Sequence, residues 1–129
     1  MSKKILAVDD SGSLRQMLSF TLRSGGYQVV DAVDGVDGLK KAQASPCDLV
    51  LTDQNMPNMD GLEACRRLRA IEAQAQEPRR PVFALTGKAF AEDIAKCQAA
   101  GMDGHLAKPI QLDDLMGVLR TVQGAIKRH

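Results

Sequence analysis

Four short polar signals in this sequence contain the residue types that bind a metal ion and stabilise a phosphoryl group in transfer. They are the pair Asp9-Asp10, the single Asp53, Thr86, and Lys108. Three carboxylates gathered in one cleft would repel one another unless a cation joined them. With no His or Cys among these signals, the ligands would all be oxygens, so a hard ion such as Mg²⁺ is the natural choice.

The same residues suggest a reaction. A metal ion, the Lys108 ammonium and the Thr86 hydroxyl around an aspartate are the groups that stabilise a phosphoryl group in transfer. In-line attack by a carboxylate oxygen of Asp53 would form an acyl phosphate, which is a known form of nucleophilic catalysis. This chemistry requires that the chain fold so that the four signals converge.

Five short apolar runs predict the strands that would bring the signals together. Most runs are continuously apolar rather than alternating, which is typical of parallel strands covered on both faces. They comprise residues Ile5–Val8, Tyr27–Val30, Leu49–Leu51, Val82–Leu85 and His105–Ala107.

Helical patterns lie between and after these runs. Gly25 is placed to end the first predicted helix, Asp34 to cap the second, and Asp60 to open the third as part of a capping box with Glu63. The polar stretch Ala73–Arg80 is predicted to be a mobile loop. The five predicted helices cover Leu14–Leu22, Gly35–Ala44, a segment beginning near Asp60, Phe90–Gly101 and Leu112–Ile126.

Five repeats of strand then helix predict an α/β fold, a five-stranded parallel doubly wound sheet with five helices. In the strand order 2-1-3-4-5, strands one, three, four and five are neighbours. The signals Asp9-Asp10, Asp53, Thr86 and Lys108 follow the carboxyl ends of these four strands in turn. Doubly wound sheets bind ligands beyond those ends, so we expect one shared pocket.

Composition limits the function. We expect residues 1–129 to form a single domain with no output domain, because 129 residues suit one core. A net charge of +1 and an aromatic content of 3% argue against direct binding of nucleic acid. The apolar run after the N-terminal lysines is too short for a signal peptide or a membrane span, and the three cysteines have no disulfide or zinc spacing. A cytoplasmic protein with reduced thiols and no membrane partner is expected.

Over essentially its whole length the sequence resembles the receiver domains of two-component response regulators. The resemblance is carried by Val8-Asp9-Asp10, the block from Asp53 to Gly61, Ala84-Leu85-Thr86, and Lys108-Pro109. It implies a flavodoxin-like fold and a domain of phosphorelay signal transduction. Such a domain is a phosphoacceptor that catalyses its own phosphotransfer and dephosphorylation, and is not a turnover enzyme.

The resemblance also implies a role for each acidic residue of the pocket. Asp53 would be the phosphoacceptor and one of the Mg²⁺ ligands. Asp10 would bind the ion directly, and Asp9 directly or through water. Asn55 would bind it through its backbone carbonyl.

By the same resemblance, Thr86 would hydrogen-bond to the phosphoryl group and Lys108 would pair with it. His105 stands where the family usually has Tyr or Phe, so we hypothesise that it moves with Thr86 as a pH-sensitive switch. An ordinary half-exposed strand histidine stays an open alternative. Asn55 and Lys88 would tune the phosphoryl lifetime, with the Lys88 ammonium impeding the attacking water.

The implied phosphoryl donor is a phosphohistidine on a sensor histidine kinase or phosphotransfer protein, or a small donor such as acetyl phosphate. The responding surface, fourth helix to fifth helix, would bind an unidentified protein target better in one state. Residues Ile5–Gly35 resemble stand-alone chemotaxis regulators, whereas Leu62–Ile110 resemble receivers fused to hybrid kinases. Both arrangements stay open, and a monomer or weak dimer is expected.

Two other functions fit parts of the pattern. A phosphatase of the haloacid-dehalogenase type also uses a nucleophilic Asp with Mg²⁺, but places it after the first strand with a second Asp two residues on. Here the first strand is followed by adjacent aspartates, and Asn55 stands two residues after Asp53. A degenerate receiver that only binds proteins is the other alternative, although all the groups needed for phosphorylation are present.

Overall fold

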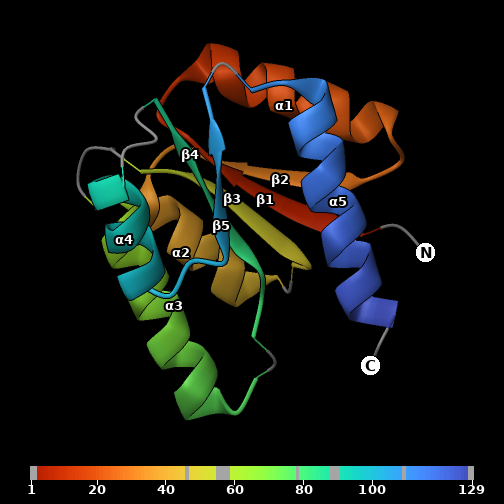
Figure 1. Cartoon of the computed structure of the whole chain (residues 1–129). Helices are drawn as coiled ribbons and strands as arrows, with labels where there is room; N and C mark the ends of the chain where they lie inside the picture. The colour runs from red at the N-terminus through yellow and green to blue at the C-terminus, as the bar shows by residue number, and fades with distance from the viewer. Residues whose placement is uncertain are drawn as a thin grey trace.

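The computed structural model describes residues 3–45, 47–54, 59–77, 79–87, 91–108 and 110–127, with the backbone alone for 122–127. Strands and helices alternate along this part of the chain, as the sequence predicts (Figure 1). The strands are β1 (Lys4–Val8), β2 (Gln28–Ala32), β3 (Leu49–Asp53), β4 (Val82–Thr86) and β5 (Gly104–Ala107). The helices are α1 (Gly12–Ser24), α2 (Gly35–Ala44), α3 (Gly61–Ala75), α4 (Ala91–Ala99) and α5 (Leu112–Lys127).

The five strands form one parallel sheet in the order β2-β1-β3-β4-β5, which confirms the predicted topology. The register aligns their carboxyl ends. Val8 pairs with Thr52, Asp53 pairs with Leu85, and β4 and β5 end together. Residues that follow these strands therefore meet at the carboxyl end of the sheet.

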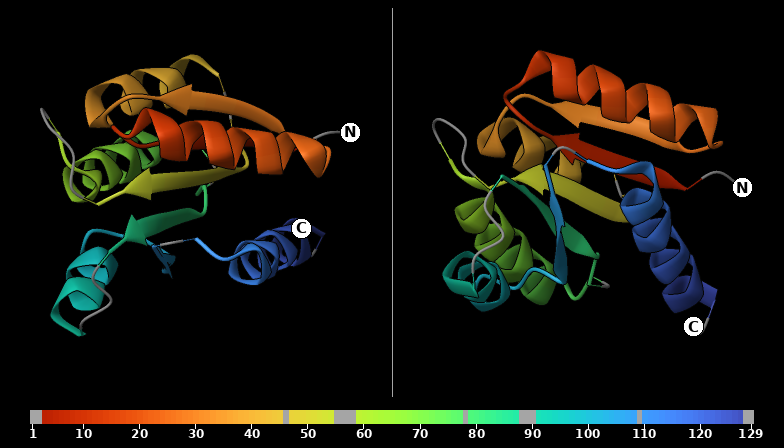
Figure 2. Two further views of the ribbon diagram at one scale, coloured as in Figure 1. Left: turned by 90° about the horizontal axis from the view of Figure 1, so that it is seen from above. Right: turned by 45° about the horizontal axis from the view of Figure 1, so that its top comes forward.

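Alternate residues of each central strand enter two separate cores because successive side chains point to opposite faces. On β3, Leu49 and Leu51 pack with α1 and α5, whereas Val50 packs with α2, α3 and α4. Figure 2 shows this division of the helices between the two faces of the sheet. Burial on both faces explains why the strands read as continuous apolar runs.

Side chains cap the first three helices and fix where each begins. Asp34 and Asp60 accept hydrogen bonds from the main-chain N–H groups of Asp37 (2.8 Å) and Glu63 (2.9 Å), as predicted. Ser11 caps α1 in the same way. The Glu63 carboxylate is turned toward two arginines of its own helix, so the reciprocal half of the predicted capping box is replaced by exposed ion pairs.

The prediction of a mobile loop over Ala73–Arg80 was wrong about where the loop begins. The third helix continues through Ala75, and Gln76 ends it in the left-handed region with φ 55°. Arg80 pairs with the buried Glu72, and Arg79 with Asp103. Long side chains that reach across the fold give no local pattern in the sequence.

Among the described residues, no helix combines the length and the hydropathy needed to cross a bilayer.

Candidate functional site

The carboxylates predicted to bind a metal come together at the carboxyl edge of the sheet. Asp9 follows β1, Asp53 is the last residue of β3, and each of the carboxylates of Asp9, Asp10 and Asp53 has an oxygen within 4.8 Å of the others. Asp9 is fully buried, Asp53 is 8% exposed, and Asp10 is exposed. The cluster therefore has a buried floor and an open side that faces solvent.

Lys108 supplies the positive charge of this cluster. Its Nζ lies 3.2 Å from Asp9 Oδ2 and 3.2 Å from Asp53 Oδ1. Burial lowers the pKa of Lys108, but the hydrogen bond and charge of Asp53, followed by those of Asp9, outweigh burial and raise it above the ordinary value. The ammonium is therefore the stable form of this residue between the two carboxylates.

Thr86 is the last residue of β4 and so lies at the same carboxyl end of the sheet. Thr86 is buried, and its carbonyl accepts a 2.8 Å hydrogen bond from the main-chain N–H of Lys108. This bond ties the residue that carries the ammonium to the strand that carries the hydroxyl. Because β3 and β4 are adjacent, Thr86 and Asp53 belong to neighbouring strand ends.

The donor set fits a hard divalent cation. Asp9 Oδ2 is buried, and its partner among the described residues is the Lys108 ammonium 3.2 Å away. Three carboxylates carry more negative charge than one ammonium offsets, and a divalent cation would balance the remainder. The cluster offers oxygen atoms alone, which are the ligands that Mg²⁺ prefers.

Three further predicted residues differ in what the structure describes. His105 is half-buried on the edge strand β5, opposite Ala84 and on the face of the sheet that carries Thr86. Asn55 and Lys88 lie outside the described residues. Their predicted contributions to metal binding and phosphoryl lifetime stay predictions.

Two further residues shape this site: Gly61, which the sequence indicated only as part of the block from Asp53 to Gly61, and Arg15, which sequence reasoning missed. Gly61 lies against the main chain of Asp53, where a Cβ would come 2.3 Å from the Asp53 carbonyl oxygen. Arg15 donates a 2.6 Å hydrogen bond from Nη1 to the carbonyl of Asp9. The Asp-Gly pair before a helix was a usable signal for Gly61. Nothing in the spacing of Arg15 signals that it turns back toward β1.

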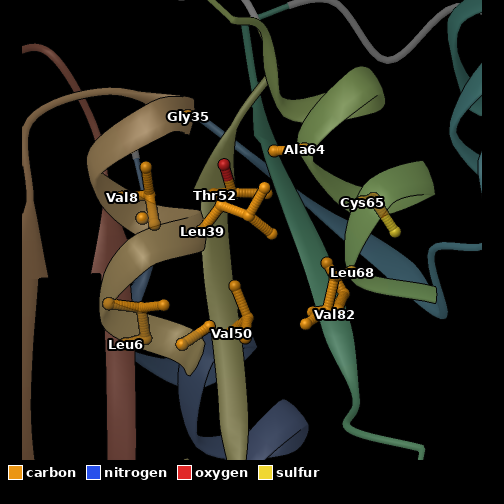
Figure 3. Close-up of a pocket in the computed structure, with 12 residues that line it drawn as sticks. Leu6, Val8, Gly35, Leu39, Val50, Thr52, Ala64, Cys65, Leu68 and Val82 are labelled. Carbon is orange, nitrogen blue, oxygen red and sulfur yellow. The ribbon is translucent and has the colours of Figure 1, made fainter. Parts of the chain in front are cut away.

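An apolar cavity of about 30 Å³ lies between the sheet and the helices α2 and α3 (Figure 3). Thr52 contributes the polar atom visible in its wall, and Thr52 Oγ1 donates a 3.1 Å hydrogen bond to the Asp53 carbonyl. The lining is otherwise made of aliphatic side chains, Cys65 and glycines. It lacks the charged groups that phosphoryl chemistry needs, so the carboxylate cluster is the candidate site.

The three cysteines take no part in the site. All are buried free thiols, as predicted. Burial is the main cause that raises the pKa of the Cys47 thiol to about 11, and it also raises the pKa values of Cys65 and Cys97. A thiol with a raised pKa is a poor nucleophile.

Comparison with known proteins gives consistent results. The family model described as response regulator receiver domain matches residues 5–120. The sensor histidine kinase RcsC of Salmonella typhi is 39% identical over 124 residues, which are 96% of this chain but 13% of RcsC. The Bacillus subtilis regulatory protein PhoP is 38% identical over 109 residues, covering 84% of this chain and 43% of PhoP. The chain thus spans about an eighth of RcsC and less than half of PhoP.

Solved structures match over nearly the whole chain. The chemotaxis protein CheY4 of Vibrio cholerae is 39% identical with a TM-score of 0.85, and the match covers 95% of this chain and 99% of CheY4. The receiver domain of the sensor histidine kinase PA1611 from Pseudomonas aeruginosa is 34% identical with a TM-score of 0.85, covering 96% of this chain and 99% of that domain. That structure has a magnesium ion coordinated in its active-site cleft.

Proposed function

Because the chain belongs to the family of response regulator receiver domains, we propose that Asp53 is the residue that accepts the phosphoryl group. Receiver domains are phosphoacceptor signalling domains. The observation that carries the assignment of Asp53 is its position, 8% exposed at the carboxyl end of β3 with the Lys108 ammonium 3.2 Å from Oδ1. A carboxylate held in this way beside an ammonium group is a suitable nucleophile.

The metal ligands are proposed to be the carboxylates of Asp9, Asp10 and Asp53, together with the backbone carbonyl of Asn55. The oxygen-only donor set and the buried Asp9 Oδ2 support Mg²⁺ as the ion. When bound, the ion would supply positive charge to the phosphoryl oxygens. The magnesium in the cleft of the PA1611 receiver domain supports this choice of ion.

The proposed reaction forms one bond and breaks another. A carboxylate oxygen of Asp53 attacks the phosphorus in line, the bond from phosphorus to the donor's imidazole nitrogen breaks, and the imidazole regains a proton from solvent. Lys108 pairs with the phosphoryl oxygens as charge moves onto the site, and the Thr86 hydroxyl donates to one of them. Water later attacks the phosphorus, the bond from phosphorus to the Asp53 oxygen breaks, and inorganic phosphate leaves with the Asp53 carboxylate restored. Lys88 is proposed to slow that step.

The response is proposed to travel through Thr86. Phosphorylation adds roughly −1.5 to −2 charge units and three acceptor oxygens. Movement of Thr86 toward them would open space beside the half-buried His105 and bias the surface formed by α4, β5 and α5 between two states. A protein target that prefers one state would then be bound or released.

The phosphoryl donor is proposed to be a phosphohistidine of a sensor kinase or phosphotransfer protein. A cytoplasmic location agrees with three buried free thiols. Membership of the receiver family leaves the haloacid-dehalogenase alternative without support. A degenerate receiver is the alternative that experiment has to exclude.

The deciding experiment is reaction with acetyl phosphate and Mg²⁺, followed by intact-protein mass spectrometry. We expect the wild-type chain to gain the mass of one phosphoryl group and Asp53→Asn to gain none. Asp60→Asn is the matched control, because Asp60 caps α3 and asparagine is an equally good cap. A wild-type chain that stays unmodified at saturating donor would contradict the proposal and leave a protein-binding module.

A further inference from the structure

Arg15 is more deeply covered than an ordinary helix-surface arginine. It lies in the first turns of α1, and 18% of its side chain is exposed. Nη1 donates to the Asp9 carbonyl at 2.6 Å, while Nε is buried, has no hydrogen-bond partner among the described residues, and faces Asp31 Oδ2 at 3.6 Å. The guanidinium therefore joins α1 to the ends of both β1 and β2.

Among the described residues, three hydrogen bonds hold Asp9 in addition to its ion pair with Lys108, and Arg15 provides one of them. Its main-chain N–H donates to Ala32 O at 3.1 Å, its carbonyl accepts from Arg15, and its Oδ1 accepts from the Ser11 N–H at 2.8 Å. Oδ2 is the carboxylate oxygen that takes part in none of these hydrogen bonds, and it is the buried atom beside Lys108. Each bond removes a way in which that oxygen could turn away from the cluster.

We propose that Arg15 is a positioning residue for the divalent cation, acting through the backbone of Asp9. The inference rests on the proposed function, because it assumes that Asp9 binds the ion. Groups that orient a metal ligand commonly change metal affinity by about 10- to 100-fold when they are removed. Arg15 touches neither the ion nor the phosphoryl group in this role.

The charge of Arg15 acts in the opposite sense to its hydrogen bond. A cation near the cluster repels a second cation, so loss of charge alone would make Mg²⁺ bind more tightly. That repulsion is reduced here because Asp31 faces the guanidinium at 3.6 Å and a carbonyl accepts its shortest bond. Loss of positioning should therefore dominate, and the sign of the change in affinity distinguishes the two effects.

The test is titration calorimetry of Mg²⁺ into the unphosphorylated chain. We expect Arg15→Gln to weaken binding about 10-fold, and Arg15→Lys to weaken it less because lysine keeps one donor. Arg23→Gln is the matched control. It removes the same charge from the same helix, where Arg23 Nη2 donates to the Val29 carbonyl at 3.3 Å, away from the cluster. This control should bind Mg²⁺ as the wild type does.

Two additional readouts separate positioning from a general loss of structure. The Ser11 amide resonance should shift in metal-free Arg15→Gln, because its acceptor is Asp9 Oδ1. Urea unfolding in chelator should show that Arg15→Gln and Arg23→Gln are both fully folded under the conditions of the titration. Mg²⁺ binding by Arg15→Gln that is equal to or tighter than that of the wild type would overturn the inference. If Arg15→Gln does not fold, the same comparison is made with Arg15→Lys, and binding as tight as that of the wild type would overturn the inference. Failure of the wild type to bind Mg²⁺ would instead overturn the proposed function.

Discussion

Lys108 is the residue that offsets the negative charge of the carboxylate cluster when no metal ion is bound. Its ammonium lies 3.2 Å from a carboxylate oxygen of Asp9 and 3.2 Å from one of Asp53, and 28% of its side chain is exposed. Its raised pKa means that folding binds this proton more tightly than the unfolded chain does. The stabilisation is complete below the ordinary pKa of 10.5 and is lost as pH rises through the higher folded value.

Replacing Lys108 by Met should therefore destabilise the metal-free domain, because two carboxylates lose their shared partner. We expect a loss of about 1–3 kcal/mol in the free energy of unfolding at neutral pH. The difference from wild type should shrink above about pH 10.5 as the wild-type lysine loses its proton. Urea unfolding in chelator at several pH values measures this.

Lys96→Met is the control for Lys108→Met, since Lys96 is an exposed lysine of α4. It should leave stability nearly unchanged. A Lys108→Met protein as stable as the control at pH 7 would show that the carboxylate cluster does not depend on the ammonium.

Among the elements, α3 has the closest contact with the proposed phosphoacceptor, because its first residue, Gly61, packs against the backbone of Asp53. Gly61 N–H donates to the Gln54 carbonyl at 3.1 Å, and a Cβ on Gly61 would meet the Asp53 carbonyl oxygen at 2.3 Å and Thr52 Oγ1 at 3.2 Å. A side chain at this position must push the helix and the end of β3 apart. Glycine is therefore required by a close approach of two backbones.

Gly61→Ala should destabilise the domain by about 1–3 kcal/mol, the usual cost of overpacking. It should also slow phosphorylation by acetyl phosphate, because Asp53 is displaced. Gly117→Ala is the opposite case, since a Cβ on this helical glycine meets nothing within 4 Å. We expect Gly117→Ala to stabilise by about 0.5–1 kcal/mol. Equal stability of the two variants in thermal unfolding would contradict the close approach at Gly61.

Ion pairs join α3 to the amino edge of the sheet, opposite the site. Glu72 is 4% exposed, with Arg69 Nη1 at 2.9 Å and Arg80 Nη1 at 3.5 Å from its oxygens. Arg69 also bonds to Asp103, which precedes β5. Arg80, the last residue of the segment predicted to be a mobile loop, is part of this network.

Glu72→Gln should cost about 2–3 kcal/mol, because it leaves covered guanidinium groups without their carboxylate. Glu63→Gln makes the same change on the same helix at an exposed pair, where we expect less than about 1 kcal/mol. Chemical denaturation of both variants compares them directly. Similar losses would show that burial does not govern the strength of this network.

At the scale of the whole molecule, metal binding should stabilise the fold because the ligands come from separate strands. The proposed Mg²⁺ site exists only when β1 and β3 are paired, so the ion binds the folded state. At free Mg²⁺ ten times the dissociation constant, linkage gives about 1.4 kcal/mol. This corresponds to a rise of about 5 °C in the melting temperature for a domain of this size.

Thermal unfolding with Mg²⁺ and with excess chelator tests this expectation. Chelator should reverse the shift, and Asp53→Asn should reduce it by removing one ligand. A melting temperature that Mg²⁺ leaves unchanged in the wild type would contradict a site formed by the folded strands.

Much of the fold was predictable because its signals are local. Residues such as Leu49 to Leu51 read as one apolar run since helices cover both faces of the sheet, and Asp34 and Asp60 capped the helices that they precede. The candidate site followed from these elements. Once parallel strands share a direction, Asp9, Asp53 and Thr86 must lie at the same edge.

What the amino-acid order determined by itself was the succession of strands and helices and which polar residues follow which strand. Tertiary structure alone decided the contacts of long or absent side chains, such as the turn of Arg15 onto Asp9, the pairing of Arg79 with Asp103, and the contact of Gly61 with Asp53. The physical reason is range. Hydrophobic periodicity and capping act over a few residues, whereas these contacts depend on which distant backbones the completed sheet brings together.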